Sequence, residues 1–251
     1  MNMNKRFFII AAMVVAATSI LITGCFNKKA TGMKVTPSAI MIPVNNNNSL
    51  SADIEPIEAM TSTSITWTIS DPNIATIDKL SDDWVLIQPK NVGEAVVTAK
   101  TKKGDFTSSA LVIINPVKID DDYATQIPGF YFGNTKINGE TVEINKLITA
   151  KYHDRNQMVF SMDDKFKLSR TENVECSIKV DYIADVTKEG EYSYKYRAAG
   201  EIDVTIDGKT YPATIEGIFS GTLDLSIKIK EVPELGTVTV NFSGYEKYKV
   251  D

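Results

Sequence analysis

The chain has 251 residues, enough for one large domain or two ordinary ones. Hydrophobic residues make up 43% and charged residues 24%, a balance that excludes a disordered or fibrous chain. The formal net charge of −5 argues against nucleic acid as a partner, and a single His with two Cys excludes most zinc clusters and disulfide scaffolds.

Residues 1–24 have the organisation of a secretory signal peptide. A Lys-Arg pair at residues 5–6 precedes an apolar run over residues 7–22, which is shorter than the roughly 20 apolar residues that cross a bilayer comfortably. The run ends in Leu-Ile-Thr-Gly-Cys at residues 21–25, which resembles a lipobox. That resemblance implies cleavage before Cys25, whose sulfur then carries diacylglycerol.

Several acyl chains on Cys25 would hold the mature protein on a membrane, because each buried methylene adds about 0.8 kcal/mol of affinity. This covalent lipid is the one non-protein group that we expect, with no other cofactor and no metal. The alternatives are an ordinary signal peptide or an uncleaved anchor in which Cys25 is incidental.

Residues 25–32 are interpreted as a short polar tether. Phe26 is not the Asp that retains lipoproteins in the inner membrane of well-studied enteric bacteria, so we expect an outer-membrane lipoprotein of the cell envelope. Lys28 and Lys29 have the opposite sign to the acidic residues that direct surface export in some Gram-negative lineages. The periplasmic and the surface-exposed face of the membrane are therefore both left open.

A shift in composition divides the rest of the chain into two domains. Trp67 and Trp84 both precede residue 118, whereas all ten tyrosines and the single His lie from Tyr123 onward. The expected divisions are a first domain over 33–115, a linker over 116–119 and a second domain over 120–251. Polar and apolar residues alternate nearly throughout both domains, which predicts an all-β fold.

Residues 65–70 have the clearest strand pattern of the first domain. Ile65, Trp67 and Ile69 alternate with hydroxyl-bearing residues, as a half-buried strand requires. Residues 71–73, Asp-Pro-Asn, signal a turn. Further short strands are predicted over 74–78, 85–87, 93–99 and 110–114.

Three stretches of this domain carry a family resemblance. They are residues 35–38, residues 65–68 together with 74–78, and Gly93 with Ala95, Val97, Thr98 and Ala99. In this order they resemble the group 2 bacterial immunoglobulin-like domain, which implies a two-sheet sandwich with Trp67 between the sheets and no disulfide. The sequence departs from the family at residues 45–48, where a Gly-containing turn is usual, and at Trp84, in a segment usually free of Trp.

Members of this family occur in bacterial adhesins and in many secreted multidomain proteins, some as binding modules and many as spacers. Both roles are therefore open for the first domain. Trp84 is the candidate contact residue: an exposed Trp84 would favour a contact site, and a buried one would be a second core Trp.

Alternation is strongest in the second domain. Strands are predicted over 174–182, 202–206, 211–219, 223–229 and 237–242. Asn138-Gly139 and Asp207-Gly208 signal two-residue hairpins. The pattern amounts to about eight strands with one apolar face each, which predicts a closed antiparallel β-barrel.

The late part of this domain resembles the calycin-like, lipocalin-like domains of bacterial lipoproteins. The resemblance rests on residues 223–229, Gly236 and residues 240–245. Residues 129–131, Gly-Phe-Tyr, stand where lipocalins usually have Gly-x-Trp. An eight-stranded barrel either holds one small ligand or is filled by side chains, and the sequence leaves both open.

The second domain has one aromatic stripe and no convincing catalytic motif. Tyr192, Tyr194 and Tyr196 would project from one strand face, where they could stack on sugar rings or apolar ligands, or form an aromatic ladder. The single His153 has no Gly-x-Ser-x-Gly elbow to supply a serine, so an exposed loop histidine is expected. Cys176 falls on an apolar strand face, as a buried thiol would.

Two acidic stretches complete the search for chemistry. Residues 120–122 could offer carboxylates to calcium, but they lack EF-hand spacing, which favours a solvated linker. Residues 163–164 could form a carboxylate pair for glycoside hydrolysis, but neighbours on a strand point to opposite faces, which favours a turn.

The sequence thus predicts a non-enzymatic, lipid-anchored cell-envelope protein. Its immunoglobulin-like domain would serve as spacer or adhesion module, and its barrel would bind an unknown ligand; carbohydrate, a small apolar ligand and protein are candidate partners. The alternative is a lipocalin-like carrier of a small apolar molecule in the barrel interior. An open, apolar interior would favour carriage, whereas a filled interior with exposed Tyr192 to Tyr196, or an exposed Trp84, would favour surface contact. A hydrolase, the third hypothesis, needs a cleft that pairs His153 with acidic groups of shifted pKa.

Overall fold

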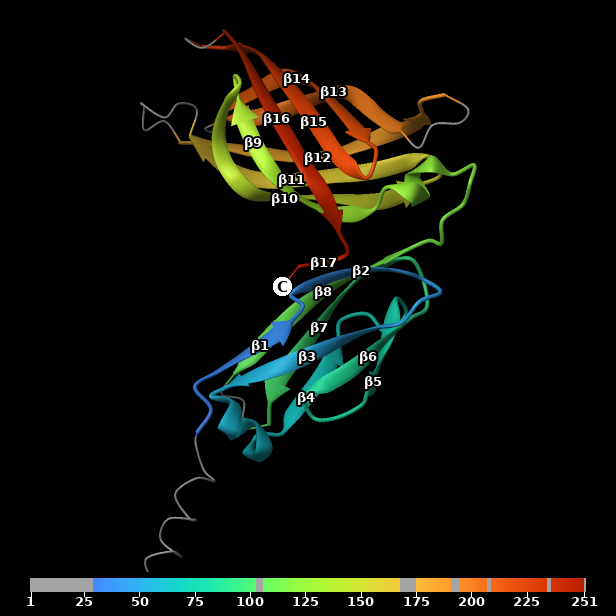
Figure 1. The fold of residues 1–251 in the computed structure, drawn as a ribbon, viewed down its shortest axis with the longest axis vertical. Helices are drawn as coiled ribbons and strands as arrows, with labels where there is room; N and C mark the ends of the chain where they lie inside the picture. The colour runs from blue at the N-terminus through green and yellow to red at the C-terminus, as the bar shows by residue number, and fades with distance from the viewer. Residues whose placement is uncertain are drawn as a thin grey trace, which may run out of the picture.

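The chain folds into two all-β bodies that lie one after the other along the long axis of the molecule (Figure 1). The computed structural model describes residues 29–102, 106–167, 175–190, 195–206, 209–233 and 236–250. The helical segments in these ranges are two short 3-10 helices, η1 (Ile57–Ser62) and η2 (Tyr123–Gln126). No helix in the described ranges has the length and apolar character needed to span a membrane. The predicted all-β class is confirmed.

The first body is a sandwich of short strands. They are β1 (Gly32–Thr36), β2 (Ala39–Pro43), β3 (Asn48–Glu55), β4 (Ile65–Ile69), β5 (Ala75–Lys79), β6 (Trp84–Pro89), β7 (Gly93–Thr101) and β8 (Thr107–Asn115). One sheet has the order β1-β3-β6-β5, and the other joins β2, β8, β7 and β4. The five strands predicted from residue 65 onward coincide with β4 to β8.

The core of the sandwich lies between its two sheets, because alternate side chains of each strand point inward. Trp67 on β4 is 9% exposed and packs in the same cluster as Leu50 and Val97. Its Nε1 donates a hydrogen bond to the carbonyl oxygen of Asp82 over 3.0 Å, which satisfies the buried indole. The predicted place of Trp67 between the sheets is confirmed.

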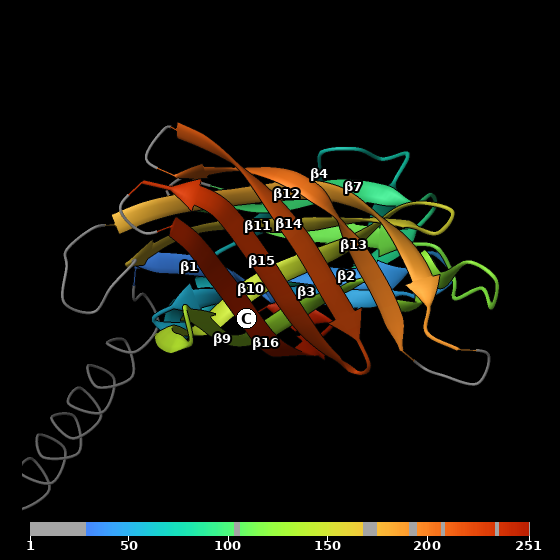
Figure 2. The same ribbon diagram turned by 90° about the horizontal axis from the view of Figure 1, so that it is seen from above.

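The second body is a closed antiparallel barrel. Its strands are β9 (Gly129–Ile137), β10 (Glu140–Asp154), β11 (Gln157–Lys167), β12 (Glu175–Lys188), β13 (Tyr196–Ile206), β14 (Lys209–Phe219), β15 (Thr222–Val232) and β16 (Gly236–Lys247). They pair in chain order, and β16 returns to β9 to close the barrel, which Figure 2 views from above. Asn138 and Gly139 have φ values of 49° and 89°, as the predicted two-residue hairpin turn requires.

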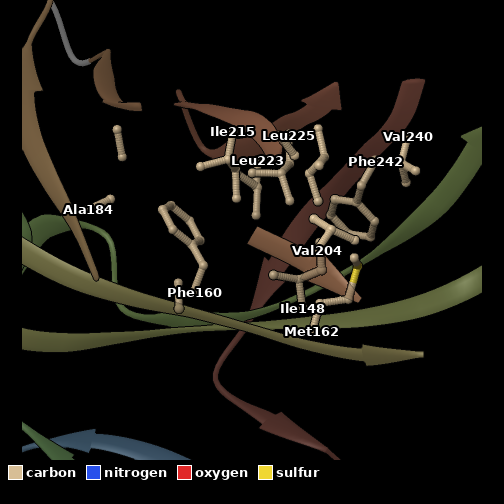
Figure 3. Close-up of a cluster of buried hydrophobic side chains, with 14 of the residues drawn as sticks. Ile148, Phe160, Met162, Ala184, Val204, Ile215, Leu223, Leu225, Val240 and Phe242 are labelled. Carbon is tan, nitrogen blue, oxygen red and sulfur yellow. The ribbon is translucent and has the colours of Figure 1, made fainter. Parts of the chain in front are cut away.

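Apolar side chains from all eight strands meet inside the barrel (Figure 3). Phe160 is 1% exposed and stacks on Phe219, with ring centroids 5.4 Å apart. Tyr131, at the Gly-Phe-Tyr start of the barrel, meets Phe219 edge-on, and its hydroxyl donates a hydrogen bond to the Ile127 carbonyl oxygen over 2.6 Å. Burial raises the pKa of Tyr131. The described core residues thus form one buried cluster inside the barrel.

A small third apolar cluster lies where the two bodies meet. Met41 on β2, Ile113 on β8 and Phe130 on β9 are buried in it. Across the same junction the ammonium of Lys151 on β10 pairs with the carboxylate of Glu94 on β7 over 2.7 Å.

The last strand of the chain also crosses this junction. After the barrel closes, β17 (Lys249–Val250) pairs antiparallel with β2 of the sandwich. The Val250 carbonyl oxygen accepts a hydrogen bond from the Ser38 amide over 2.6 Å. The final residues of the stretch predicted as the barrel domain thus extend a sheet of the sandwich.

In the acidic run at 120–122, Asp120 and Asp121 are exposed, as in the solvated linker that the sequence predicts, but Asp122 is buried. Asp122 is 5% exposed, and its carboxylate accepts hydrogen bonds from the Asn156 amide (2.8 Å) and the Tyr152 hydroxyl (3.2 Å). The run therefore docks on the turn between β10 and β11, because a buried carboxylate needs donors.

The predicted turn at residues 163–164 is also wrong. Asp163 and Asp164 lie within β11, where they pair with Lys179 and Ile178 of β12. The long regular ladder between β11 and β12 overrides the local turn preference of two consecutive aspartates.

Candidate functional site

Trp84 begins β6 and lies on the outer face of its sheet. Its side chain is 48% exposed, whereas the next residue, Val85, is fully buried. Leu80, which is 49% exposed, lies across the β5–β6 hairpin, and its amide donates a hydrogen bond to the Trp84 carbonyl oxygen over 3.0 Å. The second-core-Trp alternative is therefore wrong, and Trp84 is available for contact.

Polar side chains border the exposed indole. Trp84 pairs with Ser51 of β3, which in turn pairs with Thr36 of β1, so the three residues form one row across the sheet. The Thr36 hydroxyl donates a hydrogen bond to the Asp53 carboxylate over 3.0 Å. We call Thr36, Ser51, Asp53, Leu80 and Trp84 the Trp84 face. Aromatic rings flanked by hydroxyls and a carboxylate can stack on a sugar ring and hydrogen-bond its hydroxyls.

The loop that leads into β6 carries two aspartates next to Trp84 in the chain, and one of them is paired with a lysine. The Lys79 ammonium lies 2.5 Å from the Asp82 carboxylate, and this hydrogen bond is the main cause that lowers the pKa of Asp82. The Ser81 hydroxyl donates to the Asp83 carboxylate over 2.6 Å. These contacts order the loop next to the indole.

The predicted tyrosine stripe is described in part. Tyr192 and Tyr194 lie outside the described residues, and so does Cys25. Tyr196 begins β13, packs against the barrel core and lies 6.0 Å from the ring of Tyr123, at an interplanar angle of 36°. For Tyr196 this favours the core-ladder alternative over a free stacking platform.

The remaining candidates form no reactive cluster. His153 is exposed, as predicted, although it lies near the end of β10 at a bulge rather than in a loop. The backbone of Cys176 lies in β12, and its side chain is outside the described part. Among the described side chains, no three His, Cys, Asp or Glu residues gather so that they could hold a metal ion.

Sequence reasoning missed the place where the barrel wall is least complete. In the described ranges, β12 and β13 pair at three positions beside their connection, whereas β13 and β14 pair along their whole length. A recess of about 790 Å³ lies beside β13, and its lining includes Tyr182, Glu201, Ile202, Asp203, Ala213 and Lys230. Local alternation could not signal this recess, because both strands keep their pattern although their ladder of paired residues ends early.

Comparison with known families places the first body. Residues 29–112 match the bacterial Ig-like domain (group 2) family, in agreement with the sandwich fold and with the resemblance seen in the sequence. The match covers no part of the barrel. A comparison with curated proteins finds no match.

Two solved structures are similar in outline. A putative outer membrane protein from Bacteroides fragilis aligns over 80% of this chain and 74% of its own, with 13% identity and a TM-score of 0.37. The surface layer protein SbsC, domains 1–6, aligns over 90% of this chain and 27% of its own, with 12% identity and a TM-score of 0.33. Neither similarity carries an argument about function.

Proposed function

We propose that this protein is a non-enzymatic bacterial cell-envelope protein, held on the outer membrane by lipid on Cys25. In this proposal the sandwich supports the barrel and contacts a carbohydrate through the Trp84 face. The observation that carries the contact role is the 48% exposure of Trp84 on an outer sheet face.

The order of the parts supports the spacer role. The described chain enters the sandwich at Gly32, beside Glu55, at the end that carries η1, and the barrel lies at the other end (Figure 1). A lipid attached through residues 25–32 would therefore leave the sandwich near the membrane and the barrel farther out. The β17–β2 pairing and the junction cluster resist free rotation of the barrel.

The barrel core and the outer face of the sandwich support a surface-contact role over the carrier role. The described barrel core is packed, which leaves less room for the lipocalin-like cargo of the alternative hypothesis. The sandwich presents an indole, hydroxyls and a carboxylate on one face instead. The match to a bacterial Ig-like family supports the envelope setting.

Mass spectrometry of the protein isolated from its own membranes tests the lipid. We expect an N-terminal peptide that begins with diacylated Cys25, and metabolic labelling with an alkyne fatty acid that is lost in Cys25→Ser. An unmodified Met1 in membrane-isolated protein would contradict the anchor.

A glycan array tests the contact role. The chain from residue 26 onward, which keeps every described residue, is applied to an array of peptidoglycan fragments, bacterial polysaccharides and host glycans. Trp84→Ala should lose the bound glycans, and Leu147→Ala, at an exposed apolar position of the barrel, should keep them. Because Trp67 is buried, a ligand-induced change in tryptophan emission would come mainly from Trp84. Binding that survives in Trp84→Ala, or no glycan binding at all, would refute this role.

A further inference from the structure

The recess beside β13 is a second candidate binding site, separate from the Trp84 face. We propose that it binds an organic ammonium ion with an apolar body, such as an alkylamine, through an apolar floor, the ring of Tyr182 and two carboxylates. The site lies in the barrel and does not depend on the function proposed for the sandwich.

The recess lies where the pairing between β12 and β13 ends. Beyond three residue pairs the described residues of the two strands no longer pair, so the inward-facing Tyr182 and Ile202 lose a covering neighbour. Both pack against the barrel core and stay partly exposed. Tyr182 pairs with Phe160 of β11, whose side chain lies in the core, and paired residues share a face. The floor of the recess is therefore continuous with the core.

Gly200 allows the Tyr182 ring to lie against β13. A Cβ atom at this position would overlap the Tyr182 hydroxyl oxygen, so a larger residue would displace the phenol. Because Glu201 follows directly, the ring lies beside the strand that supplies both carboxylates. Side chains alternate along β13, so Ile202 faces inward with the ring while Glu201 and Asp203 lie on exposed, outward-facing positions. The ring therefore belongs to the floor of the recess and the carboxylates to its mouth.

The composition of the lining suits an amphipathic cation. Ile202, Ala213 and Pro212 supply apolar surface, and Glu201 and Asp203 supply carboxylates that form no ion pair with a described residue. Lys230 is the one basic side chain in the described lining, so the carboxylates outnumber the ammonium groups. The volume of about 790 Å³ falls within the range of roughly 300–1,000 Å³ typical of small-molecule sites.

The charges around Tyr182 also favour a bound cation. Burial is the main cause that raises the pKa of its phenol, and the negative charges of Asp185 and Glu201 raise it further. The ring therefore stays neutral at physiological pH. A negative potential that disfavours a phenolate attracts a cation, which gains a further cation–π interaction above a tyrosine ring. The same potential repels an anion.

Calorimetry with three probes of equal chain length tests the site on the chain from residue 26 onward. We expect n-hexylammonium to bind, n-hexanol to bind more weakly and hexanoate not to bind. The double variant Glu201→Gln, Asp203→Asn should weaken n-hexylammonium binding by roughly tenfold, as expected for loss of charge-assisted contacts. The control Glu140→Gln, Glu189→Gln removes two exposed carboxylates outside the recess and should bind as the parent does.

The ring is tested separately. Tyr182→Phe should retain n-hexylammonium binding, and Tyr182→Ala should lose most of it, with far-UV circular dichroism as the check of folding. Equal binding of hexanoate and n-hexylammonium, an unchanged affinity in the carboxylate variant, or no binding of n-hexylammonium would each overturn the proposal. The comparison of probes on the parent chain decides the charge preference even if a variant unfolds.

Discussion

The sandwich and the barrel bury one apolar face per strand in different ways. Sandwich strands of 5 to 9 residues stack as two sheets, so each sheet covers the other and keeps an outer face free. Barrel strands of 9 to 15 residues curl around a shared interior, so a place where two strands stop pairing lies directly over the core. Contacts can therefore form on the outer face of the sandwich, at Trp84, and in the wall of the barrel, beside β13.

A cavity in the barrel core should destabilise the barrel much more than the sandwich. Phe160→Ala should lower the free energy of unfolding of the barrel by about 3–5 kcal/mol, because it leaves a cavity against Phe219. Every Trp lies in the sandwich and every Tyr lies from Tyr123 onward, so tryptophan fluorescence follows the sandwich and near-UV tyrosine dichroism follows mainly the barrel.

The control for this variant is Ile183→Ala, at a position that is 47% exposed, which should change stability by no more than about 0.5 kcal/mol. A fluorescence transition that shifts as far as the tyrosine transition in Phe160→Ala would show that the two bodies unfold as one.

A smaller effect is expected at the start of the barrel. Asp122→Ala leaves the Asn156 amide and the Tyr152 hydroxyl without their acceptor, which should cost about 1–3 kcal/mol. Urea denaturation followed by tyrosine dichroism measures the loss, with the exposed Asp120→Ala as control. Equal stability of the two variants would contradict a structural role for the buried carboxylate.

Removing β17 should weaken the junction between the two bodies. A chain that ends at Tyr248 loses the hydrogen bonds that Val250 accepts from Ser38, at an expected cost of roughly 1–2 kcal/mol. The tryptophan and tyrosine transitions should then move apart. A chain that ends at Val250 keeps β17 and is the control; transitions that stay together in the shorter chain would mean that the apolar cluster alone couples the bodies.

The smallest effect is a dependence on pH at Glu246, near the junction. Burial raises the pKa of this carboxyl, and the charge of Lys118 opposes the rise. The folded state therefore holds the proton to higher pH than the unfolded chain does. The resulting stabilisation is complete below the unfolded pKa and is lost as the pH rises through the folded pKa.

Glu246→Gln cannot ionise, so it should flatten this dependence and raise stability at neutral pH by less than about 1 kcal/mol, since the group is partly solvated. Urea titrations from about pH 4 to pH 7 measure the change, with exposed Glu231→Gln as control. Destabilisation at neutral pH would indicate that the Lys118 attraction outweighs burial.

Much of the fold could be predicted because its signals are local. The strands β4 to β8, the buried Trp67 and the Asn138-Gly139 turn follow from alternation and turn residues close together in the chain. Two predictions failed because the decisive partners lie far away in the chain. Asp122 found donors at Asn156 and Tyr152, and Asp163 was paired within β11, so distant partners overrode local preferences.

The all-β class, the family resemblance of the first body and the closed meander of the second could be predicted from the sequence, because the side-chain period of a strand shows in consecutive residues. Three features became visible only in the folded chain: Trp84 faces outward, β17 returns to the sandwich, and the β12–β13 ladder ends before Tyr182. These depend on which strands meet in space, and pairing between segments far apart in the chain leaves no mark in either segment alone.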